Sequence, residues 1–182
     1  MSRRPKKPLA ARLARRLAAG LARYPDAEGV WGPPPAYRGP APEAQTALAG
    51  VYARLDAALA PAADACRACG QCCRFTEGGI VLFASALELA HLVATAGMPR
   101  AGTFVAGGPV NSAWSCPYQE GNLCTGRAAR PLGCRTYFCD SQAGAEGRAL
   151  HADSLNAVRR IAADGQYPWW YGPARLCLAA WV

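Results

Sequence analysis

Apolar residues recur every three to four positions between Glu43 and Ala60, which predicts an amphipathic helix. The residues of this apolar stripe are Leu48, Val51, Tyr52, Leu55 and Leu59. Pro61 cannot continue a helix, so the helix is expected to end just before it. The stripe predicts packing against a hydrophobic core rather than against a partner.

A second helix is predicted between Ser85 and Gly97, preceded by a short buried strand at residues 80–83. Ser85 is followed three residues later by Glu88, the spacing of a capping box, which accounts for this acidic residue without a metal. Gly97 and Pro99 are typical of a helix end. The side chains expected to face the core are Leu87, His91 or Leu92, and Ala94.

The last third of the chain is expected to hold one helix and an aromatic cluster. The helix is predicted at residues 153–163, after a small, polar loop at residues 141–149. The aromatic stretch at residues 167–172 is expected to pack over the core or to shield a bound metal from solvent. Together these patterns predict an α+β fold with a few helices, short strands and long loops.

The N-terminal part has a different composition, which predicts that residues 1–42 precede a domain formed by residues 43–182. Residues 1–24 contain eight basic residues and no acidic one, so they account for the whole formal net charge of +8. Leucine at every fourth position in this tail predicts a short basic amphipathic helix. Residues 25–42 contain six prolines and are expected to be an extended linker.

The basic tail limits the partners and the location of the protein. It could contact nucleic acid or an anionic surface, although a solubilising extension is also compatible with its composition. No apolar run approaches 18 residues, so no transmembrane segment is expected. The apolar stretch between the arginines of the tail is too short for a secretory signal, so a cytoplasmic location is expected.

Eight of the nine cysteines fall into two clusters that predict a metal site. Four of them lie within residues 66–74, a segment called here the cysteine knuckle. The other four follow the predicted strand and helix, so the fold must bring the two clusters together. The candidate metal ligands, within a motif core of residues 66–139, are Cys66, Cys69, Cys72, Cys73, Cys116, Cys124, Cys134 and Cys139.

The donor set indicates the class of metal. Thiolate sulfur selects zinc, Cu(I) or iron–sulfur clusters over hard cations. Three cysteines spaced by two residues are typical of an iron–sulfur loop, whereas zinc fingers usually supply two ligands per segment. A disulfide framework is the alternative, but it needs an oxidising compartment and is disfavoured by the odd cysteine count. Because neighbouring side chains diverge, Cys72 and Cys73 are expected to serve two different four-sulfur sites.

The order of these motifs resembles a known family. The matching parts, from residue 60 to residue 140, are Cys66-x-x-Cys69-Gly-x-Cys72-Cys73-Arg74, the strand at residues 80–83, the helix start from Ser85 to Glu88, Cys116-Pro117, Cys124, and Arg130-Pro131-x-x-Cys134-Arg135-x-Tyr137-x-Cys139. They are similar to the CxxCxxCC family of zinc- or iron-chelating (YkgJ-type) cysteine-cluster proteins. The chain departs from that pattern at Thr125 and Gly126, where an apolar–aromatic pair is common. The resemblance implies a bacterial, cytoplasmic iron–sulfur or zinc protein, often described as an oxidoreductase.

Two functions follow from the cysteine pattern. The first is an iron–sulfur protein that acts in electron transfer or redox chemistry with a protein partner. The second is a zinc-stabilised interaction module, or a zinc or iron chelator without enzymatic activity. The arginines expected to offset the charge of the thiolates are Arg67, Arg74, Arg127, Arg130 and Arg135. The sequence identifies no catalytic residue and leaves open whether the protein is an enzyme.

Overall fold

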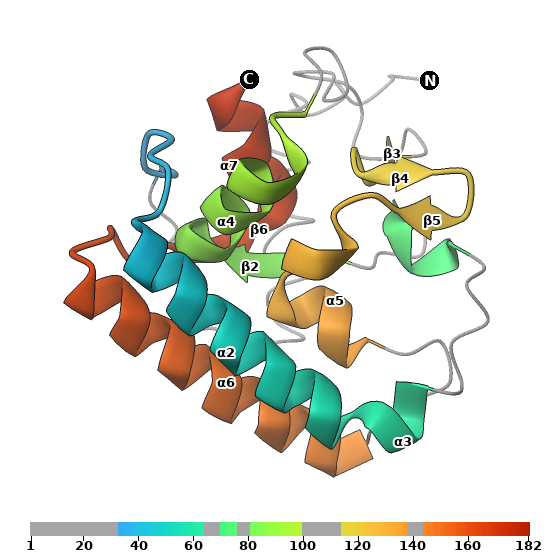
Figure 1. Ribbon diagram of the computed structural model, residues 1–182. Helices are drawn as coiled ribbons and strands as arrows, with labels where there is room; N and C mark the ends of the chain where they lie inside the picture. The colour runs from blue at the N-terminus through green and yellow to red at the C-terminus, as the bar shows by residue number, and fades with distance from the viewer. Residues whose placement is uncertain (1–32, 64–69, 76–80, 100–113, 138–143) are drawn as a thin grey trace, which may run out of the picture.

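The computed structural model describes residues 33–63, 70–75, 81–99, 114–137 and 144–182 (Figure 1). The described part contains helices and three two-stranded antiparallel ladders, which confirms the predicted α+β class. Two long helices, α2 (Pro42–Ala58) and α6 (Gly144–Asp164), lie side by side and antiparallel along one edge of the molecule (Figure 1). None of the described helices is both long and apolar enough to cross a bilayer.

A second group of elements packs on this helix pair. Strand β2 (Phe83–Ser85) leads directly into helix α4 (Ala86–Ala96), and β6 (Tyr171–Pro173) leads into α7 (Ala174–Trp181). The two strands pair antiparallel, with Ser85 opposite Tyr171. This pairing places α4 and α7 next to each other above α2 and α6.

The remaining elements are short, and those that Figure 1 labels lie in the right half of the view. The short helical segments are α3 (Ala60–Ala63), η1 (Gln71–Cys73), η2 (Arg127–Ala129) and α5 (Leu132–Thr136). The short strands are β1 (Arg74–Phe75), β3 (Trp114–Ser115), β4 (Gln119–Glu120) and β5 (Leu123–Cys124). Strand β1 pairs with β3, and β4 pairs with β5.

The hydrophobic core lies between the long helices and the β2–α4 and β6–α7 units. Its fully buried side chains include Leu48, Leu87, Leu89 and Val158. The stripe predicted for the first helix is buried as expected. Tyr167 and Trp170 also belong to the core, which confirms that the aromatic stretch packs over it.

Three predictions about the elements need correction. The predicted strand at residues 80–83 is a strand at Phe83–Ser85, because its pairing partner is the β6 segment. Ala94 is exposed and Val93 is buried in its place. Helix α6 begins at Gly144 rather than at residue 153, because its first turns pack against α2 and α5 although they lack an apolar period. Residues 144–149 are therefore helix and not loop.

Candidate metal centre

The described part of the cysteine knuckle begins with a tight turn at Gly70. Its backbone φ is +71°, in the left-handed region that favours glycine. A Cβ at this position would lie 2.6 Å from Nε2 of Gln119 and 3.0 Å from Cα of Asn122. The Gly70 carbonyl accepts hydrogen bonds from the Cys73 N–H and the Gln119 side-chain amide, both at 3.1 Å. Glycine is needed here because the turn bends sharply and lies directly against the β4–β5 hairpin.

Backbone pairing brings the knuckle next to the second group of cysteines. Strand β1 pairs with β3, with Arg74 opposite Ser115. Immediately beside this ladder, the Cys116 N–H donates to the Cys73 carbonyl at 2.8 Å. The Cys116 thiol lies near enough to that of Cys73 to raise its pKa. The two cysteine clusters, distant in the sequence, therefore meet through main-chain contacts.

The segment from Cys116 to Cys124 forms the predicted hairpin. Gln119 lies opposite Cys124 in the β4–β5 ladder, and Gly121 at the turn has φ +58°. The Cys116 carbonyl accepts a hydrogen bond from the Gln119 N–H at 2.9 Å, which closes the entry to the hairpin. The hairpin thus places Cys124 on the strand that returns toward the knuckle.

The departure from the family pattern after Cys124 fits the local packing. The Tyr118 carbonyl accepts hydrogen bonds from the Thr125 N–H at 2.8 Å and from its hydroxyl at 3.1 Å. A Cβ on Gly126 would lie 2.5 Å from Cδ1 of Leu92 on helix α4. Thr125 and Gly126 therefore close the hairpin against the core, in a way that an apolar–aromatic pair would not.

Helix α5 carries Cys134 and is fixed at its first turn by Glu88. The Leu132 N–H, which has no partner within the helix, donates to Oε1 of Glu88 at 2.8 Å. A Cβ on Gly133 would lie 2.7 Å from Cδ1 of Leu82, so α5 packs closely on the chain before β2. The position of Cys134 is therefore set by contacts with the start of α4.

Glu88 caps two helices at once. Its Oε2 accepts hydrogen bonds from the N–H and the hydroxyl of Ser85, each at 2.8 Å, and completes the predicted capping box. Complete burial raises the pKa of Glu88, although its hydrogen bonds from Leu132 and Ser85 oppose this change. All the contacts of its two oxygens are structural, so Glu88 positions α5 and does not serve as a metal ligand.

Arg135 holds the loop before α5 rather than the thiols. Its guanidinium donates to the carbonyls of Arg130 at 2.8 Å and Ala128 at 2.6 Å, and to the carboxylate of Asp56. It also lies over the ring of Tyr52, 4.0 Å from the centroid. With its side chain only 3% exposed, Arg135 joins α2 to the η2–α5 segment. The expected role of Arg135 in offsetting thiolate charge is thus replaced by a structural one.

The thiols of the three cysteine segments influence one another. Burial raises the pKa of Cys134, and the neighbouring Cys73 and Cys124 raise it further. Burial also raises the pKa of Cys124, which Cys73 raises further. The pKa of Cys73 is raised first by its hydrogen bond with Cys116 and then by burial. In the absence of a cation the thiols therefore keep their protons, and a bound metal would have to displace these protons.

Arg130 acts on three of these thiols, and Arg127 also lowers the pKa of Cys124. The positive charge of Arg130 lowers the pKa of Cys73, Cys124 and Cys134, opposing burial in each case. Its Nε is buried and has no hydrogen-bond partner among the described residues. The nearest carboxylate, Asp56, lies 4.0 Å from its terminal nitrogen. A buried N–H donor without a partner beside several thiols fits a site that holds anionic sulfur.

Cys72 and Cys73 lie closer together than expected. Their Sγ atoms are 4.0 Å apart, Cys72 exposed and Cys73 half-buried. Both belong to η1, where successive side chains point about 120° apart and not to opposite sides. Two sulfurs on one tetrahedral zinc lie about 3.8 Å apart, given Zn–S bonds of about 2.3 Å. The assignment of Cys72 and Cys73 to two different sites stays a prediction.

The structure places five of the eight candidate ligands. Cys66, Cys69 and Cys139 lie outside the described residues. Within the part of the chain that the structure describes, no three side chains of cysteine, histidine, aspartate or glutamate are grouped so that they could hold a metal ion. No disulfide joins any two of the six described cysteines. The eight-cysteine ligand set therefore stays a prediction.

The other candidate side chains have structural surroundings. His91 is buried with its ring 6.0 Å from that of Tyr52, and burial lowers its pKa. His151 lies within α6 and contacts Thr136 and Tyr171. Cys177 is fully buried in α7, as expected. Sequence reasoning missed Asp56 as the partner of Arg135, because nothing distinguishes it from other polar residues of its helix.

Comparisons of the chain with protein-family models, with curated proteins and with solved structures found no match.

Proposed function

We propose that this chain is a metal-binding protein whose cysteines hold the metal between the knuckle, the hairpin and α5. One observation carries this proposal: the Cys116 N–H donates to the Cys73 carbonyl at 2.8 Å, so the knuckle and the hairpin, which hold cysteines from distant parts of the sequence, meet at their main chains. Cysteines brought together from separate segments are typical of a thiolate metal site. The similarity of the motif order to the CxxCxxCC family supports the same function.

The cysteine-only donor set favours an iron–sulfur cluster, which would supply one-electron redox chemistry with a protein partner. In that case Arg130 offsets the negative charge of the sulfur, and Glu88 and Arg135 keep Cys134 in place. The requirement for reduced thiols supports a cytoplasmic location. The proposal names no substrate and no catalytic residue.

A zinc-stabilised module is the second candidate, and one observation favours it. The distance of 4.0 Å between the Sγ atoms of Cys72 and Cys73 is close to that of two sulfurs on one tetrahedral ion. In this case the metal would stabilise the hairpin and the knuckle. The protein would then act through a bound partner, with the basic tail as one contact for nucleic acid or an anionic surface.

The test is metal and acid-labile sulfide analysis of the full chain purified without oxygen, together with its visible spectrum. Iron with matching sulfide and a visible charge-transfer band is expected for the first function. Stoichiometric zinc without sulfide would replace it with the second. Protein that retains no metal after anaerobic purification and reconstitution with either metal would overturn both.

Single substitutions test which thiols take part. Cys134→Ser and Cys116→Ser are expected to lower the bound metal per chain at least tenfold in competition with a chelator, because each removes one anionic ligand. Cys177→Ala is the matched control, since Cys177 is a buried cysteine of α7 outside the cluster. Equal metal loss in Cys177→Ala would show a general effect on folding instead of a loss of ligands.

A further inference from the structure

Residues 33–41, called here the N-terminal strap, precede α2 and contact the C-terminal part of the chain. The strap contains four prolines, at positions 33, 34, 35 and 40, and has neither helix nor strand. Its last residue, Ala41, has φ −60° and ψ 151°, close to polyproline II values. The described part of the predicted linker therefore has no regular secondary structure, and it contacts the domain.

One end of the strap is held by Trp181 of helix α7. The indole N–H of Trp181 donates to the carbonyl of Pro35 at 2.7 Å. The ring of Tyr37 lies edge-on to Trp181, with 5.2 Å between ring centroids and an interplanar angle of 62°. Trp181 therefore contacts both the backbone and the aromatic side chain of the strap.

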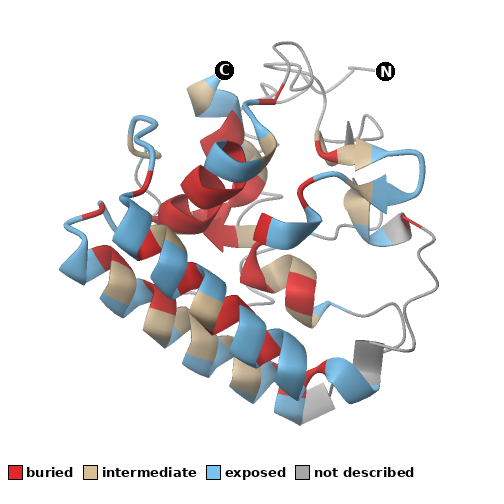
Figure 2. Cartoon of the chain, in the orientation of Figure 1, coloured by how far each residue is buried: buried red, intermediate tan, exposed pale blue. Residues whose placement is uncertain are grey.

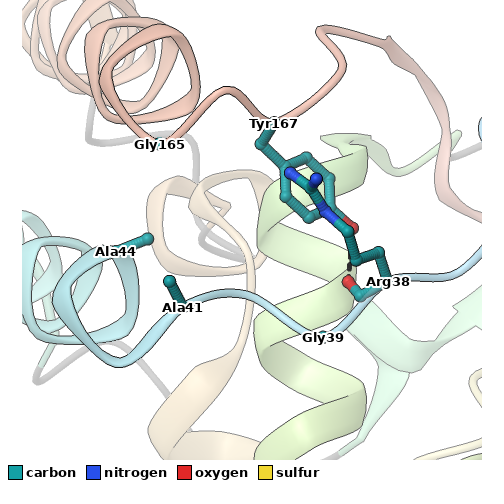
Figure 3. Close-up of a pocket in the computed structure, with 6 residues that line it drawn as sticks. All are labelled: Arg38, Gly39, Ala41, Ala44, Gly165 and Tyr167. Atoms are coloured by element: carbon teal, nitrogen blue, oxygen red, sulfur yellow. Dashed lines mark hydrogen bonds between the residues drawn. The ribbon is translucent and has the colours of Figure 1, made fainter.

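Arg38, the residue after Tyr37, holds the strap to the turn between α6 and β6 (Figure 3). The guanidinium of Arg38 lies over the ring of Tyr167, 4.9 Å from its centroid, and donates to the Gln166 carbonyl at 2.9 Å. In return, the Tyr167 hydroxyl donates to the Arg38 carbonyl at 2.8 Å. Burial raises the pKa of Tyr167 to about 12, so the hydroxyl keeps the proton it donates.

These contacts resemble those by which aromatic grooves bind proline-rich segments, because aromatic residues line the strap and their N–H or O–H groups donate to its carbonyls. We propose that Trp181, Tyr167 and Gln166 form a recognition site for proline-rich segments, and that the chain's own strap occupies this site. The corresponding partner is a segment of another protein in which prolines are followed by an aromatic residue and an arginine. This inference is independent of the metal.

The strap is attached in a way that permits exchange. Pro40 is the only residue of the strap that is buried, and Tyr37 is 38% exposed. A pocket of about 270 Å³ lies beneath it, lined by Arg38, Gly39, Ala41, Ala44, Gly165 and Tyr167 (Figure 3). Release of the strap would therefore not expose close-packed side chains of the core.

The test uses the full chain and a fluorescent peptide with the sequence of residues 33–41. In the double variant Tyr37→Ala/Arg38→Ala the strap loses both side-chain anchors, and the peptide is expected to bind with a Kd of ~0.1–1 mM by anisotropy. The wild-type chain should bind it about two- to tenfold more weakly, because its own strap competes at an effective concentration in the millimolar range. Equal binding by both proteins, or no binding by the double variant, would overturn the proposal.

Two tryptophan substitutions distinguish specific recognition from non-specific peptide binding. Added to the double variant, Trp181→Phe keeps a ring but loses the N–H donor, and should weaken peptide binding about fivefold. Trp169→Phe is the control, since Trp169 is exposed and packs on Tyr171 away from the strap. Equal effects of the two changes would contradict the assigned site.

A second measurement does not depend on peptide binding or on the double variant. In the wild-type background, Trp181→Phe should speed trypsin cleavage after Arg38 about fivefold, because the strap detaches more often. Trp169→Phe should leave that rate unchanged. If both chains are cut at the wild-type rate, Trp181 does not hold the strap.

Discussion

The helical body and the cysteine end of this protein are built on different principles. The body, formed by α2, α4, α6 and α7, buries large apolar side chains such as Leu48, Leu89 and Val158. At the cysteine end the strands are two residues long, and Tyr118 and Gly126 are the only buried residues among the described side chains of residues 116–126. Figure 2 shows the same contrast, with buried residues in the body and exposed ones along the hairpin.

The difference teaches where each part obtains its stability. Burial of apolar surface stabilises the body without any ligand. The cysteine end buries too little for this and is held by main-chain hydrogen bonds and close backbone contacts, as at Gly70. A bound metal would supply the cross-link that such a small, poorly buried region needs.

The largest effect on stability is expected in the body. Leu48→Ala should lower the free energy of unfolding by about 2–5 kcal/mol, because it leaves a cavity at a fully buried position. The control Leu123→Ala, at a position 68% exposed in the hairpin, should change it by less than about 0.5 kcal/mol. Urea unfolding followed by far-ultraviolet circular dichroism measures both. Similar losses for the two variants would contradict the division into two regions.

The next effect tests the link between the two regions. Arg135→Met should lower the free energy of unfolding by about 3 kcal/mol, because it removes hydrogen bonds to two carbonyls and the contacts with Asp56 and Tyr52. Arg148→Met is the control, since Arg148 is exposed on α6 and belongs to neither the hairpin nor α5. The same unfolding experiment applies. Metal affinity should fall only in Arg135→Met, as Cys134 precedes it, and an unchanged affinity would show that the two regions are independent.

A smaller effect is expected from Gly70→Ala. It should lower the free energy of unfolding by about 1–2 kcal/mol, because a side chain disfavours the left-handed backbone conformation of this position. Gly121→Ala is a matched control, because Gly121 also has a positive φ but a Cβ there would meet nothing within 4 Å. Chelator competition should show weaker metal binding for Gly70→Ala alone. Equal weakening in both variants would mean that strain, rather than the contact with the hairpin, determines the effect.

The smallest effect concerns the pH dependence of stability and arises in the helical body. Burial lowers the pKa of His151, whose ring nitrogens lie 3.1 Å from the Thr136 hydroxyl and 3.4 Å from that of Tyr171. Stability from the neutral ring is therefore fully present above the ordinary pKa of 6.5 and is lost as the pH falls through the lowered pKa.

His151→Gln should remove this part of the acid dependence, which unfolding curves between about pH 7 and about pH 5 would measure. The lowered pKa of His91 acts in the same direction and the raised pKa of Glu88 in the opposite one, so the two proteins must be compared at each pH. Parallel curves for the two proteins would contradict the prediction.

The sequence predicted those features that depend on neighbours in the chain. The capping box of Ser85 and Glu88, the hairpin turn at Gly121 and the stripe of the first helix all follow local rules, and all are observed. The second role of Glu88, at the start of α5, had no local signal, because Leu132 is distant in the sequence.

The candidate site was predicted less completely. The meeting of the two cysteine clusters followed from their spacing, but the ladder that joins Cys73 to Cys116 could not be anticipated from two-residue strands. The partner of Arg135 depends on how α2 crosses α5, which only tertiary packing determines. The spacing of Cys72 and Cys73 depends on the tight helical turn of η1, for which the sequence has no apolar period.

The three-segment origin of the thiols also determines the order of events during synthesis. Cys134 follows Cys73 by roughly 60 residues, which a ribosome adds in roughly 3–12 s at 5–20 residues per second. During that interval the knuckle has left or is leaving the ribosome, while α5 and the α6 helix that packs on α2 do not yet exist. The nascent chain therefore presents its first cysteines to the cell well before Cys134 and α5 have been synthesised.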